Sequence, residues 1–428
     1  MTSEQNDLMC RVEGAAPMGR VMRRHWLPVC MSEEVAECDG APRRARLLGV
    51  DLVVFRDTQG RVGVLDELCP HRRASLVYGR NEECGLRCLY HGWKFDVTGQ
   101  AVDLASEPAD AKLQQSMRTR AYPVEEAGGF VWAWLGDPEA PAPFDPPVWA
   151  KSATPPAIMK IHAECNWAQV LEGAIDSAHS SSLHSTNMPT APEVAGSTAT
   201  GTAWLRPSAD KSPRLEVERT PYGFRYAAIR RPIHDPDKQD YVRTTLFAAP
   251  FSVMIPPTDR YRLNQMLVPV DDVNCMFYWI AWHEDPAKGI SAEAWRAFCE
   301  ATPGVDLDPV TFRKFRNRGN DYLQDRAAMK AGDFTGIRGI PVQDMAMWES
   351  MGPIADRSHD KLGSSDRAII EFRKLMLSAA QAIDTSADQD PPPQDWRNAD
   401  LFTFEGMVPK ERDWRQVVPP ASIDPFLI

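Results

Sequence analysis

The sequence has no long apolar run and no excess of positive charge. No stretch approaches the ~18 consecutive apolar residues of a membrane-spanning helix, and Met1 to Gly14 lacks the apolar core of a signal peptide. Lys and Arg number 48 against 59 Asp and Glu, a formal net charge of -11. This balance disfavours binding to nucleic acid or to an anionic membrane. We therefore expect a cytoplasmic protein that binds neither nucleic acid nor membrane.

A disulfide framework is not indicated, and a dinucleotide fingerprint is missing. The chain has nine cysteines in 428 residues, an odd number without a secretory signal, so a disulfide framework is not expected. The glycine pattern that cradles a dinucleotide pyrophosphate is absent, so any reducing equivalents would come from a partner protein. The hydrophobic fraction of 43% is ordinary for a globular protein, and the length predicts two or three domains.

Two short motifs place four metal ligands at characteristic spacing. Cys69 and His71 form a Cys-x-His pair, and Cys88 and His91 form a Cys-x2-His pair. Two thiolates and two imidazoles suit a Rieske [2Fe-2S] cluster, in which the cysteines hold one iron and the histidines hold the other. A zinc site is the alternative, but zinc fingers place both cysteines in one pair and both histidines in the other. The mixed pairs favour the Rieske cluster.

A second group of ligands lies in the segment 167–182, which we predict to be helical, and just beyond it. Asp176 and His179 are three residues apart and would share a helix face, and His184 follows five residues later. A carboxylate would complete a facial triad for non-haem Fe(II), and Asp344 is the best candidate. The competing acids are Asp333, Glu349 and Asp356. A structural role for the histidines stays open, as does an outer hydrogen-bonding role for Asp176.

The chain pattern predicts an α+β protein. An N-terminal helical segment at 1–25 precedes a β-rich domain at 26–140, which carries the four cluster ligands, and a proline-rich linker at 141–156. The rest, 157–428, has strand patterns between Thr202 and Trp282 that indicate an antiparallel sheet. Helical spacing follows at Pro341–Met351 and Ala368–Ile383.

These motifs together resemble the oxygenase (α) component of Rieske non-haem iron ring-hydroxylating oxygenases, over nearly the whole chain. Three stretches are most similar to the phthalate dioxygenase subgroup: Val170–Ser181, Tyr322–Arg326, and Glu349–Ser358 with Leu362–Asp366. Two positions depart from the common pattern. Gly173 stands where many members have Asn, and Arg73 stands where Gly is usual.

The resemblance implies a Rieske domain and a helix-grip catalytic domain, with an antiparallel sheet around a long helix. It implies that Asp344 joins His179 and His184 in holding a mononuclear Fe(II). It also implies that Asp176 carries electrons from the cluster of a neighbouring subunit, in a homotrimer or in stacked trimers. The partner that supplies the electrons would be an NADH-dependent flavin and iron–sulfur reductase.

An aromatic carboxylate substrate would need cations above an apolar floor, because the planar fork of Arg binds carboxylates bidentately. We predict Arg206 and Arg243 for this role, with Ser180 as a further donor. The function expected is cis-dihydroxylation of phthalate at the 4,5-position with O2. The alternatives are oxygenation of isophthalate or chlorobenzoate, demethylation of an aromatic ether, and a non-enzymatic Rieske electron carrier.

Overall fold

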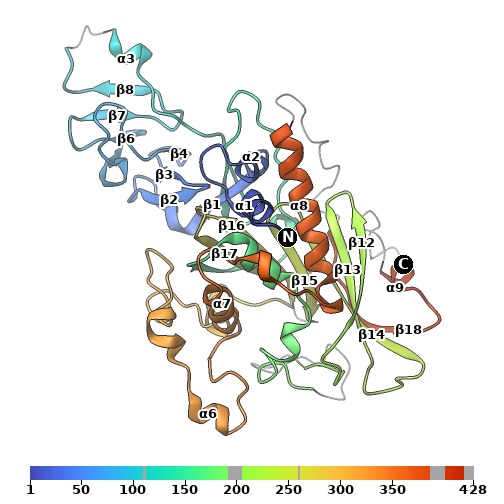
Figure 1. Cartoon of the computed structure of the whole chain (residues 1–428). Coiled ribbons are helices and arrows are strands. Elements are labelled where there is room, and N and C mark those ends of the chain that lie inside the picture. Colours follow the sequence, from blue (N-terminus) through green and yellow to red (C-terminus); the bar gives the residue numbers. More distant parts are fainter. Residues whose placement is uncertain (109–111, 191–204, 259–260, 386–400, 419–428) are drawn as a thin grey trace. The chain divides into compact units, whose positions relative to one another are not determined.

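The structure is a computed structural model, and it describes the chain except for residues 109–111, 191–204, 259–260, 386–400 and 419–428. Its contacts divide the chain into two compact units (Figure 1). One unit is Arg11–Pro146, and the other combines Met1–Cys10 with Pro147–Ile428. The predicted N-terminal segment is thus shared between them, since helix α1 (Ser3–Cys10) belongs to the larger unit and α2 (Pro17–Met22) to the smaller. The domain bounds expected from the sequence stay a prediction.

The smaller unit consists of short antiparallel sheets. Their orders are β1-β10-β9, β2-β3-β4 and β5-β6-β7-β8. The strands are β1 (Trp26–Met31), β2 (Arg43–Leu47), β3 (Val50–Arg56), β4 (Val62–Asp66), β5 (Arg80–Glu82), β6 (Gly85–Arg87), β7 (Trp93–Phe95), β8 (Ala101–Leu104), β9 (Val124–Ala127) and β10 (Phe130–Trp134), with the short helix α3 (Leu113–Ser116). One core cluster includes Phe55, Leu65, Trp93 and both Cys69 and Cys88, so the cysteines lie in the apolar interior.

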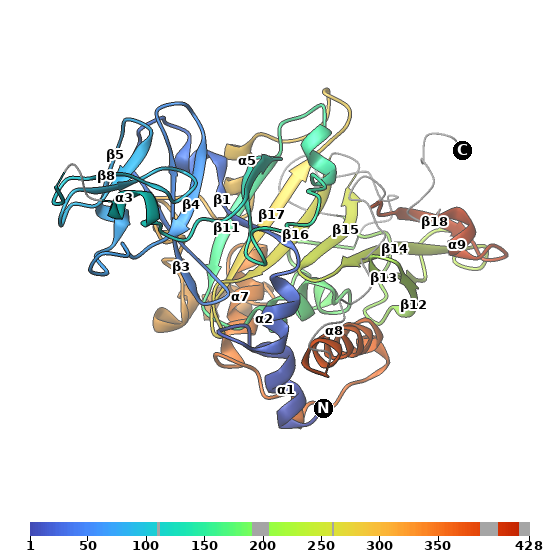
Figure 2. The same cartoon turned by 90° about the horizontal axis from the view of Figure 1, so that it is seen from above.

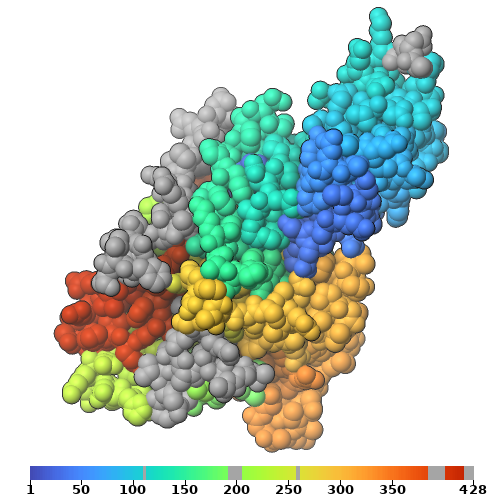
Figure 3. Space-filling view, turned by 180° about the vertical axis from the view of Figure 1, so that it is seen from behind, coloured from blue at the N-terminus to red at the C-terminus, as the bar shows by residue number. Residues whose placement is uncertain are grey.

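The larger unit is built on one antiparallel sheet of eight strands in the order β11-β17-β16-β15-β14-β13-β12, with β18 pairing with β14. The strands are β11 (Ala157–Ala163), β12 (Arg214–Thr220), β13 (Gly223–Arg230), β14 (Gln239–Ala248), β15 (Ser252–Thr258), β16 (Tyr261–Pro269), β17 (Cys275–Trp282) and β18 (Glu405–Pro409). The C-terminal residues, red in Figure 3, lie against the yellow-green residues of β12 to β14. The C-terminal segment therefore contributes the strand β18 to the sheet.

The larger unit also contains further helices besides α1. They are α4 (Trp167–Ala174), α5 (Ala292–Phe298), α6 (Arg326–Lys330), α7 (Ile340–Ser350), α8 (Arg367–Thr385) and α9 (Trp414–Val417). Figure 2 shows α8 and α1 beside each other below the fan of strands. The longest, α8, buries Phe372, Met376 and Ala380 at helical spacing against β12 and β13. Helix α4 contacts β15, β16 and β17.

The expected α+β class with antiparallel sheets is confirmed, but the metal-bearing helix is shorter than predicted. Helix α4 starts after the cap Asn166, whose side chain accepts a hydrogen bond from Ala168 N, and it ends at Ala174. The Asp176 side chain accepts a hydrogen bond from Ala178 N at 2.7 Å, and this local turn replaces the helical ladder. The chain then forms a 3₁₀ turn, His179–Ser181. Asp176 and His179 therefore meet across a turn and not along a helix face.

None of the helices within the described ranges combines the length and the apolar character needed to cross a bilayer.

Candidate metal centres and substrate pocket

The structure brings His179, His184 and Asp344 together. Their ligand atoms all lie within 4.8 Å of one another. Asp344 Oδ1 is 3.0 Å from His184 Nε2 and 3.5 Å from His179 Nε2, and the two Nε2 atoms are 3.2 Å apart. Asp344 comes from α7, whereas both histidines follow α4, so the group forms only when these helices pack together. The competing acid Glu349 instead accepts from Lys314 and Tyr322 in a separate buried cluster.

Each imidazole is oriented by a partner on its other nitrogen. His184 Nδ1 lies 2.8 Å from Gln343 Oε1, and His179 Nδ1 lies 3.3 Å from Asp176 Oδ2. Both contacts favour the tautomer that leaves Nε2 free to bind a metal. Burial alone would raise the pKa of Asp176, but the hydrogen bond from His179 and the backbone N–H groups hold it below the usual value. Gln343 was not expected from the sequence.

One observation in the structure supports iron binding by these three side chains. Asp344 Oδ1 is buried and has no hydrogen-bond partner among the described residues, although an unpaired buried carboxylate oxygen is costly. Two imidazoles and this carboxylate form the two-histidine, one-carboxylate set that non-haem Fe(II) prefers. The atom that lacks a partner is therefore the one that a metal would use.

The four predicted cluster ligands also converge, in the smaller unit. Cys69 follows β4, and Cys88 and His91 lie between β6 and β7. The rings of His71 and His91 have centroids 4.4 Å apart, and Trp93 stacks on His71 at 4.3 Å. Burial raises the pKa of the Cys69 thiol to about 11, against the backbone hydrogen bond from His71 that lowers it.

These residues fit a [2Fe-2S] cluster. Both cysteines are buried, and His71 Nδ1 is a buried nitrogen without a hydrogen-bond partner among the described residues. A buried thiolate needs a nearby cation to offset its desolvation, and iron supplies one. The departure at Arg73 has a backbone consequence, because Arg73 adopts φ 61, in the left-handed region that favours Gly.

A pocket beside the His–His–Asp group holds two of the three predicted substrate residues. Arg243 and Ser180 line it, together with the metal-binding side chains. Arg206 is not among the lining residues. Its Nη1 and Nη2 donate to Ser181 Oγ and Ser180 Oγ, each at 2.9 Å. Arg206 therefore supports the pocket wall from behind, through the serine that faces the cavity.

Arg206 and Arg243 belong to a group of three arginines, in which Arg206 is buried and Arg243 is partly exposed. The third, Arg230, is 1% exposed and donates to Ser177 O at 2.8 Å. Burial lowers the pKa of Arg206 to about 9 and of Arg230 to about 10, and the neighbouring Arg243 adds to both effects. Clustered buried cations favour an anion nearby. A signal for Arg230 was present, since this residue ends a strand in which every position is buried.

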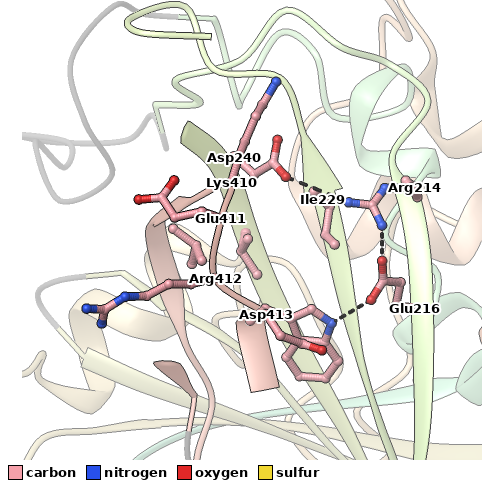
Figure 4. A pocket seen from close by; sticks show the side chains of 11 residues that line it. Arg214, Glu216, Ile229, Asp240, Lys410, Glu411, Arg412 and Asp413 are labelled. Carbon is pink, nitrogen blue, oxygen red and sulfur yellow. Dashed lines mark hydrogen bonds and ion pairs between the residues drawn. The ribbon is translucent and has the colours of Figure 1, made fainter. Parts of the chain in front are cut away.

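Another cavity, of about 230 Å³, lies between β12, β14 and the C-terminal segment. Figure 4 shows Arg214 directed at Glu216 and Asp240, and Glu216 also accepts from Trp414 Nε1 at 2.9 Å. Glu411 and Arg412 point away from its centre. Its central charges are paired with one another, so this cavity offers no evident reactive group.

Comparison with known proteins agrees with this geometry. The family model described as Rieske [2Fe-2S] domain matches residues 25–120, and the one described as LigXa C-terminal domain like matches residues 133–422. The chain is 54% identical over 416 residues to the phthalate 4,5-dioxygenase oxygenase subunit of Pseudomonas putida, covering 97% of this chain and 94% of that protein. It is 35% identical to the 3-chlorobenzoate-3,4-dioxygenase oxygenase subunit of Comamonas testosteroni, covering 97% and 96%.

Among solved structures, dicamba monooxygenase bound to dicamba matches with a TM-score of 0.58 and 19% identity, covering 85% of this chain and 99% of that chain. At this identity the likeness shows the fold alone. The resemblance inferred from the motifs is thus confirmed. Oxygenases of this family carry a [2Fe-2S] cluster in the Rieske domain and a mononuclear iron at the catalytic site, where the structure has a His–His–Asp group. The chain therefore belongs to the Rieske non-haem iron oxygenases, as the oxygenase subunit of a multicomponent ring-hydroxylating oxidoreductase.

Proposed function

We propose that this oxygenase subunit acts on phthalate and converts it to the 4,5-cis-dihydrodiol. The observation that carries the proposal is Arg243, a cation that lines the same pocket as His179, His184 and Asp344. The similarity to a phthalate 4,5-dioxygenase subunit points to the same substrate class. A substrate carboxylate matches Arg243 on the pocket wall better than a neutral ring would. Arg206 and Arg230, which lie near Arg243, add to the positive charge around this end of the pocket.

The metal assignments are part of this proposal. His179, His184 and Asp344 would hold the mononuclear iron. Cys69 and Cys88 would hold one iron of the cluster, and His71 and His91 the other. When bound, the mononuclear iron supplies O2 activation and the cluster supplies electrons.

The protein residues position the reactants. The Arg243 guanidinium binds a substrate carboxylate, while Ser180, held by Arg206, donates a further hydrogen bond. Apolar walls from Ile255 and Trp348 exclude water and keep the ring facing the metal-binding side chains. Binding of the carboxylates at one end of the ring leaves the opposite carbons for oxygenation.

Electrons come from a partner, because ring hydroxylation consumes two reducing equivalents and the chain has no dinucleotide fingerprint. The partner proposed is a flavin and iron–sulfur reductase that oxidises NADH. In a homotrimer or in stacked trimers, Asp176 would connect the cluster of one subunit with the catalytic site of the next. The partly exposed Asp176–His179 contact supports this connection on the catalytic side. Cytoplasmic location stays a prediction.

Product analysis tests the substrate. The reconstituted system would be given phthalate, isophthalate, 3-chlorobenzoate and vanillate in parallel, with consumption and products identified by mass spectrometry. We expect the highest kcat/KM with phthalate and a cis-dihydrodiol as product. Faster release of formaldehyde from vanillate would establish the demethylase instead. Faster turnover of 3-chlorobenzoate or isophthalate would show that the substrate is that aromatic carboxylate and not phthalate.

Binding measurements test the arginines. Arg243→Ala should weaken phthalate binding at least 100-fold, since an ion pair in a dry pocket is lost. Arg206→Ala should weaken it less, about tenfold, because its effect passes through Ser180. Benzoate, with a single carboxylate, serves as the comparison ligand. Unchanged phthalate affinity in the Arg243 variant would refute the proposed carboxylate site.

A further inference from the structure

The catalytic pocket has polar groups in two separate places. Arg243 and Ser180 lie at one end, and Gln265 on β16 with Trp279 on β17 also line the cavity. Gln265 and Trp279 are direct cross-strand partners, so their side chains share one face of the sheet. Strand β16 is two positions from β14, which carries Arg243. Two strand spacings amount to about 10 Å across the sheet, so Gln265 is well away from the carboxylate end.

Gln265 is a buried amide with unmet hydrogen-bonding capacity. Its side chain belongs to a residue that is 8% exposed, and its Oε1 has no hydrogen-bond partner among the described residues. The adjacent Asn264 points to the opposite face, where its Oδ1 accepts from Ser252 Oγ at 2.9 Å. An amide oxygen that is buried without a partner has lost its hydrogen bond to water without a replacement, which is unfavourable. Such a group on a pocket wall indicates that a ligand supplies the partner.

The surroundings of Gln265 are aromatic. Trp348 packs so closely on Gly173 that a Cβ there would lie 2.0 Å from the indole Nε1. Trp348 contacts Phe277 edge-on at 6.0 Å, and Phe277 stacks with Trp279 at 6.5 Å. Trp279 is the cross-strand partner of Gln265 and Trp348 lines the same pocket, so rings on this wall exclude water without offering the amide a charged partner. The amide is therefore suited to a neutral group and not to an ion.

We propose that Gln265 is a specificity-determining residue that hydrogen-bonds a neutral hydroxyl group on the ring edge remote from the carboxylates. The inference rests on the proposed function, because the carboxylates must be held at Arg243 for the far ring edge to reach Gln265. A primary amide both donates and accepts, so it can pair with a hydroxyl in either orientation. The same contact would hold a hydroxyl that the reaction places at the 4- or 5-position.

Two ligands of nearly equal size isolate this contact. 4-Hydroxyphthalate and 4-methylphthalate carry the same two carboxylates and differ in whether the ring substituent can hydrogen-bond. Titration calorimetry on the iron-replete protein should give 4-hydroxyphthalate an affinity about tenfold higher, the ratio that corresponds to one hydrogen bond of ~1.4 kcal/mol. Gln265→Met, which keeps the side-chain length, should reduce this ratio to one or below. Phthalate itself should bind the variant within threefold of the original affinity.

Asn264→Leu is the matched control, because it removes a neighbouring amide from the opposite face of the same strand and should leave the ratio unchanged. Equal affinities of the original protein for the two ligands would overturn the proposal, as would a ratio that survives in Gln265→Met. The first of these results needs no variant and so does not depend on folding. If phthalate fails to bind the original protein, the proposed function fails instead, and the two failures are thereby distinguished.

Discussion

Gln343 shows what a single unexpected residue contributes to the catalytic centre. It precedes Asp344 on α7, accepts from His184, and donates through Nε2 to Ile337 O at 2.8 Å. The hydrogen bond to Ile337 O fixes the orientation of the Gln343 amide, and this amide in turn fixes the tautomer of the His184 imidazole. No spacing rule identified Gln343, because a glutamine beside an acid is ordinary in any helix. The signal that existed was a polar residue in the buried first turn of α7.

Replacing Gln343 should weaken iron binding at the mononuclear site. Gln343→Leu leaves the His184 imidazole free to rotate, so iron affinity at this site should fall 10- to 100-fold. The measurement is iron content after dialysis against a graded series of chelator concentrations. Gln343→Glu, which keeps an acceptor oxygen, should retain more iron than Gln343→Leu. The visible absorption of the cluster should be the same in all three proteins, and parallel loss of both would contradict the assignment.

Gly173 was noted as a departure from the family pattern, and the structure gives a steric reason. A Cβ at this position would enter the indole of Trp348. Gly173→Ala should therefore lower the free energy of unfolding by about 1–3 kcal/mol through overpacking. Gly363→Ala is the control, since its nearest neighbour would be 3.7 Å away. Denaturant titration decides, and equal stability of the two variants would show that Trp348 moves aside freely.

At the scale of elements, strand pairing brings together functional residues whose contact the hydrophobic periodicity of the sequence does not predict. The C-terminal strand β18 sets Glu405 beside Arg243 and Tyr241 on β14. The 3.8 Å separation between Arg243 Nε and Glu405 Oε1 offsets part of the cost of burying that cation. Glu405, which is 162 positions after Arg243 in the chain, thus contributes to the carboxylate site because β18 pairs with β14.

His162 on strand β11 should make the stability of the protein depend on pH. His162 lies 2.9 Å from Asn274 Oδ1, and burial lowers its pKa to about 4 despite that hydrogen bond. An unfolded chain takes up the proton near pH 6.5, so protonation favours unfolding between pH 6.5 and 4. Stability should therefore fall as the pH is lowered through this window, by about 1–2 kcal/mol at pH 5 relative to pH 7.

Substitution isolates the contribution of His162. His162→Gln can still donate to Asn274 but cannot titrate, so the loss of stability between pH 7 and pH 5 should shrink by that amount. The exposed His234, changed to Gln, provides the control. Denaturant midpoints at pH 5, 6 and 7 measure the effect. Identical pH slopes for His162→Gln and the original protein would assign the acid sensitivity to other groups.

At the scale of the whole molecule, two compact units carry two different metal sites. The proposed cluster has four ligands, and its two cysteines are buried. The proposed mononuclear site has three protein ligands and lines an accessible pocket. Metal sites with open positions exchange faster than closed ones. The mononuclear iron should therefore be removable from the chain while the iron of the cluster stays bound.

Mild chelation should remove one iron per chain out of three and leave the cluster absorption intact. The loss of the mononuclear metal leaves the carboxylate of Asp344 buried without its counter-charge, so the melting temperature should decrease. Metal analysis, absorption spectra and melting curves before and after chelation check this expectation, with Fe(II) addition as the reversal. A count that stays at two irons per chain after Fe(II) addition would fit an electron carrier and contradict the proposed mononuclear site.

The sequence by itself determined the Rieske motif and the α+β class, because cluster ligands lie in short loops and strand alternation is local. It also identified the two histidines, which are only five residues apart. Only the tertiary structure showed that Asp344 lies beside these histidines, that Arg206 lies behind Ser180, and that Gln265 lines the pocket. These relations join residues from helices and strands far apart in the chain. They depend on packing of α7 on α4 and on strand order in the sheet, for which a single sequence has no local signal.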